Sequence, residues 1–391
     1  MKKTISVRQL SLIGFVSSFA LKLTILPSLF YEKSGVDAIF SLAFIMLIDF
    51  IEFLIIYYLL KKNQNVGFYQ FLCKGAGKFF SKVILLVLLL FFFFKMMLLL
   101  RGGFDYARLA IFKEAPFYLY AFILLAISTS LVLFKSRSYA RTVEFFYPII
   151  AVMFIGFIAI ALLTAPLQDL RPLLTQGPQN IFGTSFSFGI VGGNYLFMLF
   201  FMGKVKFGQK NAKTLVGHIL FGILILMTFY TINYSIFKYT ATAHPHAISE
   251  IIQFLPIPSV LGNFSWFAVS IMLLLFVLIG GLYMMCLSYC GTKIMVFKKE
   301  RPILLKISLL IINVLLVSLA YFVFDTFSEL RAFSFDSLYV PILSVITFAV
   351  PLVVLILHFV VLNKQKQQKK GKEPIKLGKL VFKGEAYEKD F

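Results

Sequence analysis

The sequence predicts an all-α integral membrane protein with about ten transmembrane helices, and three observations lead to this class. Of the 391 residues, 60% are hydrophobic and 14% are charged, whereas soluble chains average about 45–50% and about 25%. The apolar residues form long runs, such as the one that contains Phe91 to Phe94. The basic residues gather between alternate runs, as expected when one side of a membrane is the cytoplasm.

The apolar runs set the number of helices, because about 20 mostly apolar residues are needed to cross a bilayer. Ten runs come close to this length. We expect transmembrane helices near residues 10–30, 36–60, 81–100, 116–134, 143–164, 183–203, 213–238, 264–292, 302–324 and 337–362.

The Lys and Arg residues support this number and give an orientation. With the N-terminus in the cytoplasm, every cytoplasmic segment carries at least three basic residues and no outer loop carries more than three. A missed or invented helix would scramble this alternation for everything that follows. We therefore expect both termini in the cytoplasm, a transmembrane domain over residues 1–362 and a basic tail over residues 363–391.

The tail is rich in Lys and Gln and is expected to be disordered; it either lies on anionic lipid or stays solvated. The net charge of +21 comes from this tail and from the helix ends. Because no folded basic face is indicated, nucleic acid is not an expected partner.

Two segments between the spans have an amphipathic pattern. Residues 64–80 carry several Phe among polar residues, which favours a helix at the membrane interface. In the outer loop 243–263, Ile248, Ile251, Ile252 and Phe254 form a short amphipathic stretch. This loop either covers a site as a lid or packs on the surface.

Four charged residues lie at membrane depth, where charges are costly and mark functional candidates: Lys22, Asp49, Glu52 and Lys95. Lys22 and Asp49 fall at equal depth in the first two helices, and Glu52 follows Asp49 by one turn. Three interpretations stay open for this charge network: a structural salt bridge, a proton-coupling or cation-mimicking role for Lys22, or no contact. For Lys95 we expect a side chain that extends outward to the membrane surface.

Two predicted helices contain residues that interrupt a helix. The first has Ser17, Ser18 and then Pro27, and the sixth has three glycines before Asn194. These two helices begin two five-helix halves, over about 7–164 and 183–362. Breaks in corresponding helices point to a transporter's binding site, where free backbone groups bind the carboxylate and ammonium of an amino acid. The candidate substrate-binding residues are Ser18, Lys22, Thr24, Gly189, Gly192, Gly193 and Asn194. Alternatively, the glycines only allow helices to pack closely.

Nothing in the sequence indicates an enzyme, a cofactor or a metal site. The four histidines, His218, His244, His246 and His358, do not form a ligand set. Cys286 and Cys290 are four residues apart in an apolar run, which is typical of buried, inert thiols. No phosphate-binding loop or catalytic nucleophile motif is present.

Five short motifs lie along the chain: Ile5 to Leu10, Thr24 to Ser28, Gly35 to Ala38, Asp169 to Leu174 and Ile248 to Trp266. Together they resemble the spore germination permeases, the B subunits of germinant receptors, in the amino acid–polyamine–organocation superfamily. The resemblance implies a five-plus-five inverted repeat with broken helices 1 and 6 and a substrate site between helices 1, 3, 6 and 8. It further implies recognition of an amino acid or related solute, with A and C subunits as partners in the spore inner membrane.

The chain departs from that pattern at two places. Lys22 stands in the first break, where relatives often have a glycine, and it would mimic a cation, attract a carboxylate or plug the site. The charged residues expected before helix 8 are missing at Gly262 to Ser265. Two further functions therefore stay open: a proton- or cation-coupled amino acid transporter of the cell membrane, and a non-transporting membrane scaffold subunit.

Overall fold

The predicted all-helical class is confirmed by a computed structural model of the chain. The structure describes residues 5–24, 26–110, 114, 116–134, 136–170, 174, 177–205, 207, 211–244, 247–254, 265–295, 302–324, 326, 329 and 340–370. Within these residues the one β feature is an isolated bridge between Ile5 and Val205. Helices dominate because a backbone in lipid has no water to bond with and must satisfy its own polar groups.

The α-helices differ widely in length. They are α1 (Val7–Ser17), α2 (Ala20–Thr24), α3 (Leu26–Ser34), α4 (Ala38–Lys62), α5 (Phe68–Ala110), α6 (Phe117–Leu133), α7 (Ser136–Thr164), α8 (Gly177–Ser187), α9 (Asn211–Phe237), α10 (Ala247–Phe254), α11 (Ser265–Met295), α12 (Pro302–Phe322) and α14 (Val340–Lys370). Short 3₁₀ helices lie between them: η1 (Gly35–Asp37), η2 (Leu167–Leu170), η3 (Gly189–Val191), η4 (Leu196–Phe201) and η5 (Lys238–Ala243).

The chain is an integral membrane protein. Within the described residues, seven helical stretches are long and apolar enough to cross a membrane, and α6 is a shorter apolar helix of 17 residues. The two other expected spans, near 10–30 and 183–203, are each interrupted. They lack one continuous helix of membrane length because their chain leaves the α conformation inside the fold.

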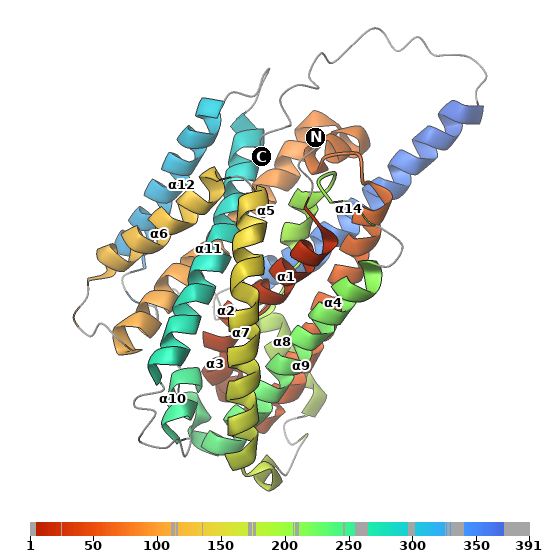
Figure 1. The fold of residues 1–391 in the computed structure, drawn as a ribbon. Coiled ribbons are helices and arrows are strands. Elements are labelled where there is room, and N and C mark those ends of the chain that lie inside the picture. The colour runs from red at the N-terminus through yellow and green to blue at the C-terminus, as the bar shows by residue number, and fades with distance from the viewer. Residues whose placement is uncertain are drawn as a thin grey trace.

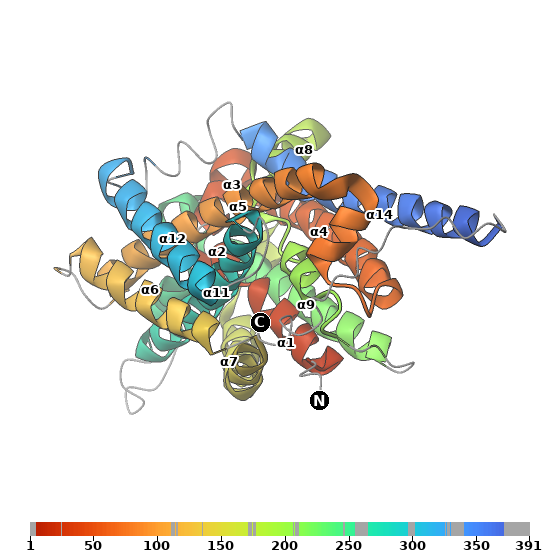
Figure 2. The same cartoon turned by 90° about the horizontal axis from the view of Figure 1, so that it is seen from above.

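The helices surround a central group (Figures 1 and 2). α6 and α12 lie on one flank, α4, α9 and α14 lie on the other, and α2, α5 and α11 lie between the two. In the most apolar stretches of α5 and α11, 61% and 67% of the residues are buried, against 28% in those of α7, α12 and α14. The side chains of these three outer helices are therefore free to face lipid.

Two boundaries differ from the sequence predictions, and a third segment is helical where an amphipathic stretch was expected. The segment expected as an interfacial helix is helical and joins the third span without a loop: α5 contains both, separated by a kink at Gly77, whose φ of +80° and ψ of 172° are not helical. α14 continues to Lys370, so the expectation of disorder from residue 363 is wrong for the first eight residues of the tail, and residues 371–391 lie outside the described part. The predicted amphipathic stretch is α10, which buries three isoleucines. Residues 245–246 and 255–263 of that loop are outside the described part.

Candidate functional site

The first interruption separates α1 from α2. α1 begins with a capping box between Ser6 and Gln9 and ends at Ser17, and a turn follows. The hydroxyls of Ser17 and Ser18 both donate to the Gly14 carbonyl oxygen, at 2.9 and 3.0 Å. Such bonds compete with the regular helical pattern and favour a bend. Pro27 lies in the first turn of α3, where proline is tolerated, so the break between α1 and α2 lies ahead of it.

The second interruption follows α8. The chain leaves the α conformation after Ser187, forms η3, and continues through Gly192 and Gly193 to η4. Gly193 has a φ of +64°, a left-handed conformation that favours glycine. Its backbone amide therefore points away from any helical partner and is available to a side chain.

Asp49 on α4 joins the two interruptions. Its Oδ2 lies 2.5 Å from Lys22 Nζ, which comes from α2. Its Oδ1 accepts the Gly193 amide at 2.9 Å, and Oδ2 also accepts Asn194 Nδ2 at 3.1 Å. The carboxylate is buried and receives three donors, which is the condition under which a charge is tolerated at such depth.

Lys95 lies at the same interruption, and the expectation that its side chain extends to the membrane surface is wrong. The residue is fully buried. Its ammonium donates to the Gly192 carbonyl oxygen at 2.5 Å and to Asn194 Oδ1 at 3.2 Å. The side chain turns inward because the unpaired acceptors of the interruption lie on that side of α5.

Glu52 is the fourth charged residue, and its contacts differ from those of the other three. It is buried one turn beyond Asp49 on α4. Within the described part of the chain, neither of its carboxylate oxygens has a hydrogen-bond partner. A buried carboxyl group without such a bond is costly, and the ammonium groups of Lys95 and Lys22 and the backbone amide of Tyr195 lie near enough to offset part of that cost.

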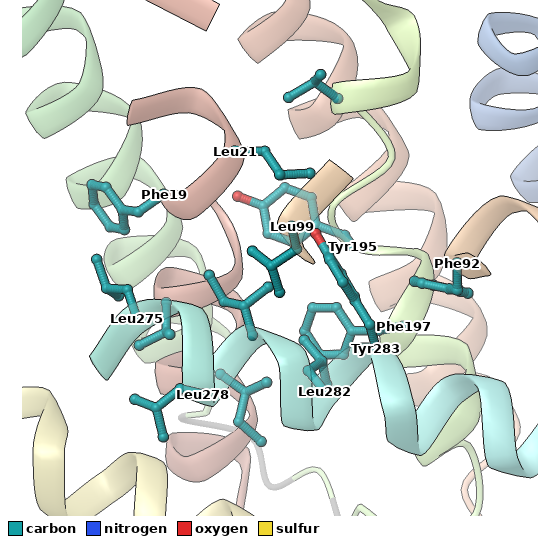
Figure 3. Close-up of a cluster of buried hydrophobic side chains, with 14 of the residues drawn as sticks. Phe19, Leu21, Phe92, Leu99, Tyr195, Phe197, Leu275, Leu278, Leu282 and Tyr283 are labelled. Carbon is teal, nitrogen blue, oxygen red and sulfur yellow. The ribbon is translucent and has the colours of Figure 1, made fainter. Parts of the chain in front are cut away.

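Two tyrosines complete the site, and the sequence analysis missed both. The Tyr230 hydroxyl on α9 donates to the Lys22 carbonyl oxygen at 2.8 Å, and Tyr195 O–H lies 3.1 Å from Ser18 Oγ. Figure 3 shows Tyr195 among buried apolar side chains that include Leu21 and Leu99. A hydroxyl on an otherwise apolar ring gives no periodic signal, so the sequence did not single out these residues.

The remaining candidate residues are placed as follows. Ser18 is buried at the first interruption. Thr24 ends α2, and its side chain lies outside the described part. Gly189 packs against α14: a Cβ on it would collide with Ser344, so it matches the close-packing interpretation of the glycines. Gly192, Gly193, Asn194 and Lys22 meet around Asp49.

These features define a class: an all-helical integral membrane protein in which two interrupted helices meet at a buried centre of charged side chains. The sequence from residue 4 to residue 323 matches the model of the spore germination protein family, and the chain belongs to that family. The family is one of membrane permeases and receptor-type proteins, so the chain is a germination-related membrane permease. No curated protein matches the chain.

Proposed function

We propose that the chain is the germinant-sensing permease subunit of a spore germination receptor. The observation that carries this proposal is the meeting of the two interruptions at Asp49, with contacts to Lys22, Gly193 and Asn194. Polar backbone at membrane depth is tolerated where it lies inside protein or lines a solute site. In transporters, interrupted helices of two related halves form such a site.

The ligand of this site is an amino acid or a related small solute. At the second interruption the Gly193 amide is bound by the Asp49 carboxylate and the Gly192 carbonyl oxygen by the Lys95 ammonium, so these backbone groups suit a carboxylate and an ammonium of a solute that replaces one of the two side chains. The proposal includes ten spans, two inverted halves, cytoplasmic termini, and A and C subunits as partners in the spore inner membrane.

A second function, proton-coupled amino acid transport, is favoured by Glu52. Carboxyl groups buried in a membrane are typical of proton relays, and Glu52 is buried without a hydrogen-bond partner among the described residues. In this function Glu52 would exchange a proton while Lys22 and Asp49 hold the interruptions together. Uptake of solute against its gradient would then require this carboxyl group.

Two measurements on the purified protein separate these functions. The first is thermal unfolding against a panel of amino acids and related small solutes, and the second is uptake of labelled solutes into proteoliposomes with and without a proton gradient. A sensor is stabilised by at least one solute and accumulates none. A coupled transporter is stabilised and accumulates the solute, and Glu52→Gln abolishes the accumulation. If no solute stabilises the protein and none is taken up, both proposals are wrong and a non-transporting scaffold remains.

A further inference from the structure

Lys95 reaches the second interruption from α5, and four groups surround its ammonium. Nζ lies 2.5 Å from the Gly192 carbonyl oxygen and 3.2 Å from Asn194 Oδ1. The ring centroids of Phe91 and Tyr283 lie 4.8 and 6.0 Å away. We call these four groups the Lys95 ammonium site.

The chemistry of this site suits a primary ammonium ion. Two neutral oxygens accept its N–H groups, and the faces of two aromatic rings attract a cation within about 6 Å. Lys95 is fully buried, so each of these contacts is stronger than on a surface. None of the four groups is a carboxylate, and the carboxylates of Asp49 and Glu52 lie near enough to attract the ammonium as well.

The other end of the same peptide unit is occupied in the complementary way. The Gly193 amide donates to the Asp49 carboxylate at 2.9 Å, next to the Gly192 carbonyl that holds Lys95. The interruption thus offers a donor and an acceptor, and the chain's own carboxylate and ammonium take both.

We propose that Lys95 is a tethered ligand: its ammonium fills a binding site that accepts a small primary amine when the side chain is absent. A solute with a primary ammonium group must then displace Lys95 to enter. The displacement of Lys95 by a solute rests on the proposed function, whereas the amine site itself does not.

Replacing Lys95 with alanine tests the site directly. Lys95→Ala deletes three methylene groups and the nitrogen, which together correspond to n-propylammonium. Unfolding is followed with a thiol-reactive dye in a Cys73→Ser background, because Cys286 and Cys290 are fully buried and react only when the fold opens. The matched control is Lys78→Ala, which removes an exposed lysine from the same helix.

We expect n-propylammonium chloride to raise the unfolding temperature of Lys95→Ala by about 3 °C or more, with saturation. At equal ionic strength, n-propanol, which lacks the charge, and tetramethylammonium, which lacks N–H donors, should have no such effect. Lys78→Ala should respond to none of them. An equal response of both variants, or an equal effect of n-propanol, would contradict an ammonium site.

A second measurement covers the case in which Lys95→Ala does not survive extraction. The fraction of monodisperse protein is then compared after extraction with and without n-propylammonium. Recovery with the amine alone supports the site, and no recovery contradicts it.

A failure of the Lys95 ammonium site and a failure of the proposed function give different results. If the amine rescues Lys95→Ala but no solute stabilises the wild type, the ammonium site stands and the germinant-sensing function fails. If a solute stabilises the wild type but no amine rescues Lys95→Ala, the tethered ligand is refuted and the sensing function is not.

Discussion

Lys22 and Asp49 form a buried ion pair, with Nζ 2.5 Å from Oδ2, between the short helix α2 and the long helix α4. Asp49 is also bound by Gly193 and Asn194. One carboxylate therefore connects the first interruption, which supplies the lysine, to the second, which supplies the amide groups. The stability of both interruptions depends on the same side chain.

Removing one member of this pair should harm the protein more than removing both charges. Lys22→Met leaves the Asp49 carboxylate buried without its cation, at an expected loss of about 3–5 kcal/mol in the free energy of unfolding. Lys22→Met combined with Asp49→Asn removes both charges and keeps the donors near a neutral acceptor. Thermal unfolding with the thiol-reactive dye measures both variants, and a double variant no more stable than the single one would rule out the pair as a stabilising contact.

Replacing Glu52 should not lower the stability of the protein, in contrast to replacing Lys22. Glu52→Met removes a buried carboxyl group that has no hydrogen-bond partner among the described residues, so the unfolding temperature should stay equal or rise. The matched control is Asp37→Leu at a buried carboxylate whose Oδ1 accepts the Leu174 amide at 2.6 Å. This control should lower the unfolding temperature. A clear loss of stability in Glu52→Met would show that the carboxyl group is bound in the folded protein.

The backbone at Gly193 should not tolerate a side chain. Gly193→Ala places a Cβ at a positive φ, which costs about 1–2 kcal/mol, and 3.0 Å from Phe91 Cζ and Thr347 Cγ2. The control is Gly183→Ala inside α8, where a Cβ would meet nothing within 4 Å. It should leave stability unchanged or raise it by up to about 1 kcal/mol. Equal unfolding temperatures for the two variants would contradict the described shape of the second interruption.

The orientation in the membrane can be tested by cysteine labelling in a Cys73→Ser background. Tyr239 lies in η5 with 86% of its surface exposed, and the charge distribution predicts that this segment lies outside. A membrane-impermeant maleimide should therefore label Tyr239→Cys in intact cells. Lys62→Cys, at the exposed end of α4, should react only after permeabilisation. The reverse pattern would place both termini outside the cytoplasm.

The pairing of Lys22 with Asp49 was predictable because it depends on quantities that a sequence contains. The short connection between the first two helices makes them neighbours, and counting residues from that connection gives equal depth. The kind of side chain then gives opposite charge. The same reasoning places Glu52 one turn away, but it does not reveal that Glu52 lacks a hydrogen-bond partner among the described residues.

The position of Lys95 was not predictable, because it depends on the rotation of α5 about its own axis. The residues around Lys95 are apolar on every face, so no periodicity indicates which face turns inward. Likewise, the contact of Gly189 with Ser344 joins residues that are far apart in the chain. Such packing follows from the assembled helices and leaves no local pattern.

The central claim, that the two interruptions form a solute site, is tested most directly by equilibrium binding of labelled amino acids and related small solutes to the purified protein. The account predicts saturable binding of at least one solute to the wild type, weakened at least about tenfold in Asn194→Ala and unchanged in His244→Ala, which alters η5 and α10 contacts. Should Asn194→Ala prove unstable, Ser18→Ala takes its place. Absence of binding to folded wild-type protein, or binding that the Asn194 and Ser18 variants retain in full, would contradict the account.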